Sequence, residues 1–194
     1  MTSGSGVREE AAVPSICVFG GSRAGRNPGY VPAAVGAGRL IARAGYGLVY
    51  GGGPDGIMGA VAEGAWAEGG TAIGVIPGFM REREGNDDPR LDVRLVETLA
   101  ERKTLMADLS AGFLVLPGGL GTYDELFEAI TWSQLGVQAK NVSILNVDGF
   151  YTPLARIFEQ LQHDGFVTAE HLARVLVTAE TEEAIAHLTS DATR

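Results

Sequence analysis

The chain has 194 residues, of which 45% are hydrophobic and 20% are charged, and its formal net charge is -9 with a pI of about 4.8. This length and composition fit a single globular domain, and the acidic balance argues against a duplex nucleic-acid surface, which requires clustered lysine and arginine. A small anionic ligand remains compatible with it, since a few local donors can hold a phosphate on an acidic protein.

The N-terminal segment differs from the rest of the chain because it lacks an apolar run. We expect residues 1–13 to form a mobile tail and residues 14–190 to form one domain. No run approaches the roughly 20 apolar residues that a membrane span requires, so we expect a cytoplasmic protein without membrane contact. The single cysteine, Cys17, excludes an intrachain disulfide and is expected to be a buried small hydrophobe.

Short apolar runs alternate with helical patterns along the domain. Strands are predicted over Ser15–Phe19, Gly47–Tyr50, Thr71–Ile76, Val93–Val96, Gly112–Leu116, Val142–Asn146 and Arg174–Val177. Helices are predicted over Pro32–Ala44, Ile57–Glu68, Thr98–Leu109, Thr122–Leu135, Tyr151–His163 and Glu182–Leu188. Because the strands are apolar throughout, both sheet faces must be covered. The sequence therefore predicts a Rossmann-like, doubly wound α/β fold, with a mostly parallel sheet of about seven strands and helices on both faces.

Glycine makes up 28 of the 194 residues, about twice its average share, and three glycine-rich segments directly follow predicted strands. These segments are Gly20–Ser22, Gly51–Gly53 and Gly118–Gly121. Ligands bind outside the carboxyl ends of the strands in such sheets, so we expect the three segments to converge on one rim. The second segment has two interpretations: backbone placed close to a base or ribose, or close packing of a helix on the sheet.

The segment Leu116–Glu125, LPGGLGTYDE, carries the strongest signal for a ligand. Its glycines let backbone N–H groups approach an anion, and the following helix adds partial positive charge. Thr122 is expected to cap that helix and to donate its hydroxyl to a phosphate. The alternative is a tight turn with an N-cap, but a turn alone does not need three glycines and a proline. The segment is not a Walker A loop, because no Gly-Lys-Ser/Thr follows.

Two charged residues have open roles at this point. Glu125 follows Thr122 by three residues, so it either completes a capping box or points a carboxylate into the rim pocket. Arg102, beside Lys103, either belongs to a solvated helix face or pairs with a phosphate or carboxylate near the rim. The three histidines lie in the C-terminal third without metal-ligand spacing, and we expect no metal site.

Residues from about 15 to 180 resemble the LOG ("lonely guy") family of cytokinin-activating phosphoribohydrolases, formerly often labelled lysine decarboxylases. The resemblance rests on VFGGSRAGRNPGY, LVYGGGPDGIMG, GVIPGFM, ERKTLMADLS, LPGGLGTYDELFEAITWSQLG and SILNVDGFY. The family pattern Pro-Gly-Gly-x-Gly-Thr-x-x-Glu is met by Pro117–Glu125. No pyridoxal lysine motif is evident to support a decarboxylase.

The resemblance implies that residues 14–190 form a single Rossmann-like nucleotide-binding catalytic domain. It implies hydrolysis of a nucleoside 5′-monophosphate, AMP or an N6-substituted AMP, to free base and ribose 5-phosphate without a cofactor. It implies that Arg102 and Glu125 are catalytic and that the protein is a homodimer whose partner completes the pocket. The predicted substrate-binding residues are Gly20, Ser22, Gly52, Gly53, Glu84, Lys103, Gly118, Gly119, Leu120, Gly121, Thr122, Tyr123, Asp124 and Thr131.

Some positions depart from the family pattern and leave the preferred base open. Leu99-Ala100-Glu101 replaces the common Met-His/Gln-x before the Arg-Lys pair, and Gln138 replaces a frequent histidine. We expect Glu125 to stabilise the positive charge that builds on the ribose, directly or by activating water. Two other functions are compatible with the same fold: a nucleotide carrier or sensor without catalysis, and a transferase that moves the sugar to another base.

Overall fold

The computed structural model describes residues 13–81 and 86–190. A seven-stranded sheet in the order β4-β3-β2-β1-β5-β6-β7 organises these residues, and every neighbouring pair of strands is parallel. The strands are β1 (Ser15–Phe19), β2 (Gly47–Tyr50), β3 (Ala72–Pro77), β4 (Leu91–Val96), β5 (Gly112–Val115), β6 (Asn141–Leu145) and β7 (Val175–Thr178). The predicted tail over residues 1–13 lies almost wholly outside the described residues.

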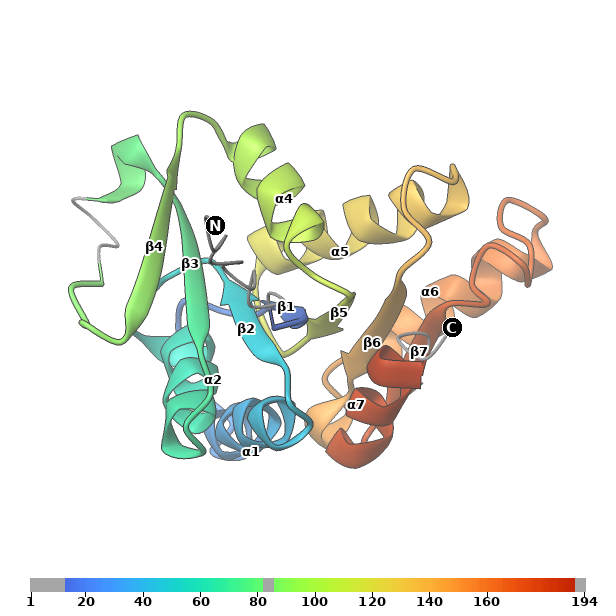
Figure 1. Ribbon diagram of the computed structural model, residues 1–194. Coiled ribbons are helices and arrows are strands. Elements are labelled where there is room, and N and C mark those ends of the chain that lie inside the picture. Colours follow the sequence, from blue (N-terminus) through green and yellow to red (C-terminus); the bar gives the residue numbers. More distant parts are fainter. Residues whose placement is uncertain (1–12, 82–85, 191–194) are drawn as a thin grey trace, which may run out of the picture.

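Helices cover both faces of this sheet (Figure 1). One layer contains α1 (Tyr30–Arg43), α2 (Gly56–Ala67) and α7 (Thr181–Thr189), and the other contains α4 (Leu99–Asp108), α5 (Leu120–Gln134) and α6 (Thr152–His163). Short 3-10 turns follow β3 and β6 at Gly78–Met80 and Val147–Gly149. This arrangement confirms the predicted doubly wound α/β fold. Among the described residues, no helix is long and apolar enough to cross a membrane.

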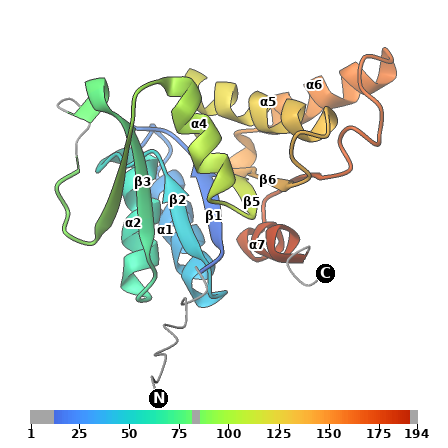
Figure 2. The ribbon, with the colours of Figure 1, turned by 45° about the horizontal axis from the view of Figure 1, so that its top comes forward.

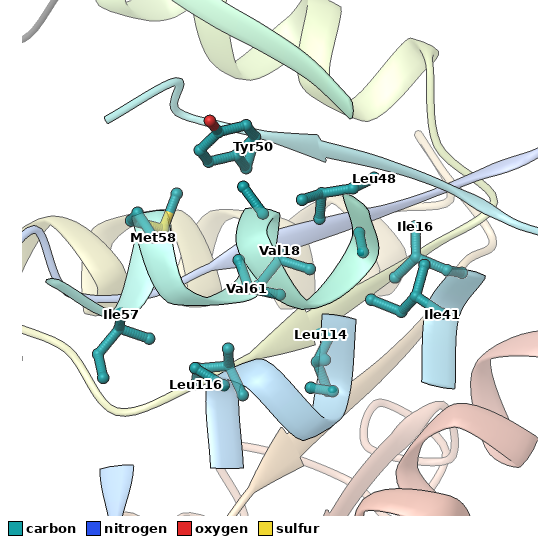
Figure 3. Packing of buried hydrophobic residues seen from close by; sticks show 14 of the residues in the cluster. Ile16, Val18, Ile41, Leu48, Tyr50, Ile57, Met58, Val61, Leu114 and Leu116 are labelled. Atoms are coloured by element: carbon teal, nitrogen blue, oxygen red, sulfur yellow. The ribbon is translucent and has the colours of Figure 1, made fainter. Parts of the chain in front are cut away.

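The side chains of each strand divide between two cores. Ile16 and Val18 of β1 pack with α1, α2 and α7, as Figure 3 shows for part of that cluster. Cys17 and Phe19 point to the other face, where they pack with α4, α5 and α6. Because successive strand residues alternate between faces, a strand that is buried on both sides must be apolar at every position.

The order in which the chain adds strands to the sheet reverses between β1 and β5. The chain builds outward from β1 to β4, then returns to the other side of β1 and continues to β7. The loops that follow β1 and β5 therefore meet at the switch point, where Gly21 N donates to Pro117 O at 3.0 Å. A crevice at such a switch point is where α/β sheets of this type bind their ligands.

Three elements begin two residues earlier than the sequence predicts, and the other boundaries agree to within one residue. Helix α5 begins at Leu120, two residues before Thr122, and its N-cap is Gly119. Helix α1 begins at Tyr30, so Pro32 lies in its first turn, where the missing N–H of proline has no helical partner to lose. Strand β4 begins at Leu91 because the parallel pairing with β3 extends back to that residue.

Candidate active site

A cavity of about 310 Å³ lies over the carboxyl ends of β1, β2 and β5. Its volume falls within the range of about 300–1,000 Å³ that small-molecule sites occupy. The lining residues are Gly20, Gly21, Ser22, Gly51, Gly53, Met58, Met80, Arg102, Gly119, Leu120, Gly121, Thr122 and Glu125. All three glycine-rich segments reach this rim, which confirms that they converge.

The amino end of α5 points its backbone at the cavity. No side chain caps this helix, so its first N–H groups are available to an anion. Thr122 lies in the first turn with only 3% of its surface exposed, so the prediction that it caps the helix is wrong. A Cβ at residue 118 would overlap the Thr122 hydroxyl, so glycine is required there for the loop to close over this turn.

Arg102 enters the cavity from the first turns of α4. That helix begins after Thr98, whose hydroxyl accepts from Glu101 N at 3.1 Å. The guanidinium passes so close to Gly51 that a Cβ at this position would overlap Nη2. Its Nε is buried and has no hydrogen-bond partner among the described residues. The structure therefore excludes the solvated-face interpretation and leaves a desolvated donor on a residue that lines the cavity.

Glu125 lines the cavity from the second turn of α5. The capping-box interpretation fails, because the helix starts five residues earlier and Glu125 is no longer at its third position. Desolvation raises the pKa of Glu125 to about 7, although the charge of Arg102 opposes the rise. At neutral pH the carboxyl group can therefore exist in both ionisation states, as groups at catalytic sites often do.

Lys103 does not reach the cavity, contrary to the expectation that it holds the phosphate. Its ammonium group pairs with Asp124 Oδ2 at 3.1 Å and with Glu128 Oε2 at 2.5 Å. Asp124, also predicted to bind substrate, is committed to the same ion pair on the exposed side of α5. Neither residue lines the cavity in this chain.

Several other predicted substrate residues are also held away from the cavity. Tyr123 packs edge-to-face on another tyrosine ring, with a centroid separation of 5.7 Å. The Thr131 hydroxyl donates to a carbonyl of its own helix at 2.7 Å. Gly52 lies against Ile76 and Gly74 of β3, so it packs on a neighbouring strand. Glu84 lies outside the described residues.

Sequence reasoning missed the two methionines of the cavity wall. Met58 lies in α2 directly after the second glycine-rich segment, and Met80 lies in the short turn after β3. Met58 has the spacing of an ordinary helix core residue, and no local pattern singles out Met80. Their polarizable side chains offer an adaptable apolar surface, which suits a flat base beside the carboxylate.

A second cavity of about 400 Å³ lies across the same glycine loops. It shares Gly21, Ser22 and Gly119 with the first cavity and includes Gly118, while Tyr30 and Phe150 supply aromatic walls. The glycine loop that follows β5 therefore borders a cavity on each side. The side that holds Arg102 and Glu125 combines anion donors, a guanidinium and a titratable carboxyl group, which suits the cleavage of a phosphorylated substrate.

Comparison with known proteins identifies a family of nucleotide phosphoribohydrolases among the similar proteins. The family described as possible lysine decarboxylase matches residues 58–188. The chain is 44% identical to the "Cytokinin riboside 5'-monophosphate phosphoribohydrolase LOG" of Oryza sativa subsp. japonica, over 86% of this chain and 68% of that protein. It is 41% identical to the phosphoribohydrolase of the same description from Rhodococcoides fascians, over 91% and 89% of the two chains. The solved molybdenum cofactor carrier protein of Chlamydomonas reinhardtii has a TM-score of 0.71 at 26% identity and covers 94% of this chain and 99% of its own.

Proposed function

This chain belongs to the possible lysine decarboxylase family, which includes the LOG phosphoribohydrolases, and on that premise we propose that it is a nucleotide phosphoribohydrolase. Its substrate is a nucleoside 5′-monophosphate, AMP or an N6-substituted AMP, and its products are the free base and ribose 5-phosphate. The observation that carries the proposal is that Arg102 and Glu125 share one cavity with the uncapped amino end of α5.

The phosphate monoester binds at the start of α5 in this proposal. Backbone N–H groups from Gly119 to Thr122 surround that end of the cavity, and the helix dipole favours negative charge there. Ser22 and Gly21 approach from the β1 loop. With the phosphate so placed, the ribose extends toward Glu125 and the base toward the methionine wall.

Cleavage proceeds through a ribose that carries positive charge. The C1′–N bond breaks with its electron pair leaving on the base, the oxygen of a water molecule bonds to C1′, and the proton lost by that water ends on the base. The Glu125 carboxylate stabilises the positive ring and accepts the proton from water. The charge of Arg102 lowers the pKa of Glu125 and so favours the ionised carboxylate, in opposition to desolvation. The guanidinium of Arg102 also donates to the substrate.

A pyridoxal-dependent decarboxylation, which the family description suggests, has no suitable amine. The lysines of the chain are Lys103 and Lys140. Lys103 is paired with two carboxylates, and Lys140 donates to the carbonyl of Ala107 at 2.6 Å. Neither lines the cavity where a Schiff base would have to form.

The proposal is tested by incubating the protein with AMP, GMP, CMP and isopentenyl-AMP and separating the products. We expect one free base per ribose 5-phosphate from the purine substrates. Intact nucleotides after exhaustive incubation would contradict hydrolysis and support the alternative of a nucleotide carrier, which is compatible with the similarity to a cofactor carrier. A transferase would instead incorporate labelled free base into nucleotide faster than it releases base.

We also propose that the protein forms a homodimer through the carboxyl half of α5. Phe127 is 40% exposed on that helix, and Leu135 and Val137, which lie just after its last residue, are 68% and 64% exposed. Trp132 is half-buried and packs on the core beneath, so it contributes to the fold as well. An apolar surface of this kind at the end of the catalytic helix is typical of a subunit interface.

A further inference from the structure

An ion cluster lies on the same turns of α4 and α5 as Arg102 and Glu125. Lys103 adjoins Arg102 in α4, and its partners Asp124 and Glu128 flank Glu125 in α5. The two helices lie side by side in both ribbon views (Figure 1; Figure 2). The side chains of Lys103 and Glu128 are 20% and 30% exposed, so water screens their interaction only in part.

We propose that Lys103 is a positioning residue, which binds α4 to α5 through Asp124 and Glu128 and thereby fixes Arg102 opposite Glu125. The inference rests on the proposed function, since it takes Arg102 and Glu125 as the reacting pair. It assigns Lys103 a role distinct from the phosphate contact that the family resemblance implies.

Helix geometry explains how one ion cluster controls the neighbouring pair. Adjacent residues diverge by about 100° around an α-helix, so Arg102 turns into the cavity while Lys103 turns onto α5. Residues four apart share one stripe, which brings Asp124 and Glu128 together on the side that Lys103 meets. Glu125 follows Asp124 and turns toward the cavity. The ion pairs and the two cavity residues therefore lie on the same turns of the same two helices.

The cluster also sets the charge around the catalytic carboxyl group. Asp124 and Glu128 raise the pKa of Glu125, whereas Arg102 and Lys103 lower it. From β1, the buried Cys17 thiol faces the same region, and desolvation raises its pKa well above the ordinary value, so it is neutral. Burial lowers the pKa of Lys103, but Glu128 and Asp124 outweigh this effect and raise it. Lys103 is therefore a permanent cation that offsets two carboxylates beside Glu125.

The test compares Lys103→Met and Lys103→Arg with the full-length wild type, using AMP cleavage as a function of pH. For Lys103→Met we expect a kcat lower by about tenfold or more, since small misplacements of reacting groups are costly, and a KM within about twofold. We expect the apparent pKa of Glu125 to rise, because two carboxylates lose their counter-ion. Lys103→Arg is expected to recover most of the rate. Arg94→Met, which removes an exposed ion pair on β4, is the matched control.

Glu128→Gln provides an independent variant if Lys103→Met does not fold. It also breaks the link between helices, so kcat is expected to fall, but it removes a negative charge and the pKa of Glu125 is expected to drop. A rate loss with opposite pKa changes in the two variants is the signature of positioning plus charge balance. Equal pKa changes of the same sign would overturn the inference.

Binding of ribose 5-phosphate, measured by calorimetry, separates the two roles of Lys103. A Lys103→Met variant that binds it tenfold more weakly while kcat is unchanged would show that Lys103 grips the phosphate itself, and the inference would be wrong. If the wild type releases no base, the proposed function fails. The titration of the Glu125 carboxyl carbon by NMR still decides the positioning role, and an identical titration in wild type and Lys103→Met would overturn it.

Discussion

At the scale of single residues, the burial of Arg102 and Glu125 lowers the free energy of unfolding. Arg102 Nε is buried without a partner among the described residues, and Glu125 holds a carboxyl group whose pKa desolvation raises to about 7. Unpaired buried donors and desolvated carboxyl groups oppose folding. Such groups are typical of a site that waits for its ligand.

We expect Glu125→Gln and Arg102→Ala to lower kcat for AMP by about a hundredfold or more, because each removes a charge that acts in the transition state. Thr131→Ala is the control on the same helix, since its hydroxyl is bonded to its own helix and lies away from the cavity. Steady-state base release measures all three. A fully active Glu125→Gln enzyme contradicts the assignment.

The pH dependence follows from the ionisation state that cleavage requires. If the Glu125 carboxylate stabilises the ribose cation, kcat is expected to rise with pH through an apparent pKa of about 7 and then level off. The measurement is kcat for AMP between pH 5 and 9 at constant ionic strength, because salt screens the charges that set the pKa of Glu125. A rate that falls with pH over the same range would show that Glu125 acts in its protonated form.

The same raised pKa predicts that the protein becomes less stable over the pH range in which the Glu125 carboxylate forms. The pKa of Glu125 is raised from 4.5, its ordinary value, so its stabilising contribution is present below that pH and is lost as pH rises through about 7. Glu125→Gln has no charge to desolvate and is expected to be about 3 kcal/mol more stable than wild type at pH 8, but nearly equal at pH 4.5. Urea unfolding at the two pH values tests this, with the exposed Glu159→Gln as a control that leaves stability unchanged.

At the scale of elements, glycines allow the backbones of α1 and α2 to approach each other closely where the two helices pack. A Cβ at Gly38 would overlap the carbonyl of Val61, and a Cβ at Gly64 would overlap that of Val35. Close contact of these helices sets the position of α2, whose first residues receive the β1 loop: Ile57 N donates to Gly21 O at 3.0 Å. The helix pair therefore supports one wall of the site from a distance.

Gly38→Ala is expected to destabilise the protein by about 2 kcal/mol or more, since backbone atoms must move apart to admit the methyl group. Gly36→Ala, in the same helix, meets no atom within 4 Å. It is expected to stabilise by about 0.5–1 kcal/mol through helix propensity. Chemical denaturation of both variants gives the comparison, and equal destabilisation would show that the glycine crossing does not matter.

At the scale of the whole molecule, the apolar end of α5 predicts self-association. Light scattering on the wild type is expected to give about twice the chain mass of 20.3 kDa. The double variant Leu135→Asp with Val137→Asp is expected to be monomeric, because it buries two charges in the interface. Leu95→Asp, which alters an exposed leucine on the edge strand β4, is expected to remain dimeric. A wild type with the mass of one chain contradicts the dimer.

The sequence by itself determined the sheet, its helical layers and the rim where the glycine segments converge. Those features follow from local patterns: strands buried on both faces are apolar throughout, and glycines mark turns after Phe19, Tyr50 and Leu116. The family motif then placed Arg102 and Glu125 among the candidates, and the structure brings both to one cavity.

Only the tertiary structure decided how the helices are rotated toward that cavity. Moving the start of α5 by two residues, from Thr122 to Leu120, makes Glu125 a cavity residue instead of a cap. Arg102 of α4 lines the cavity whereas Lys103 pairs with carboxylates of α5, although the two are neighbours in sequence. A helix turns by about 100° per residue, so such choices depend on contacts between distant segments, and no local pattern of residues records them.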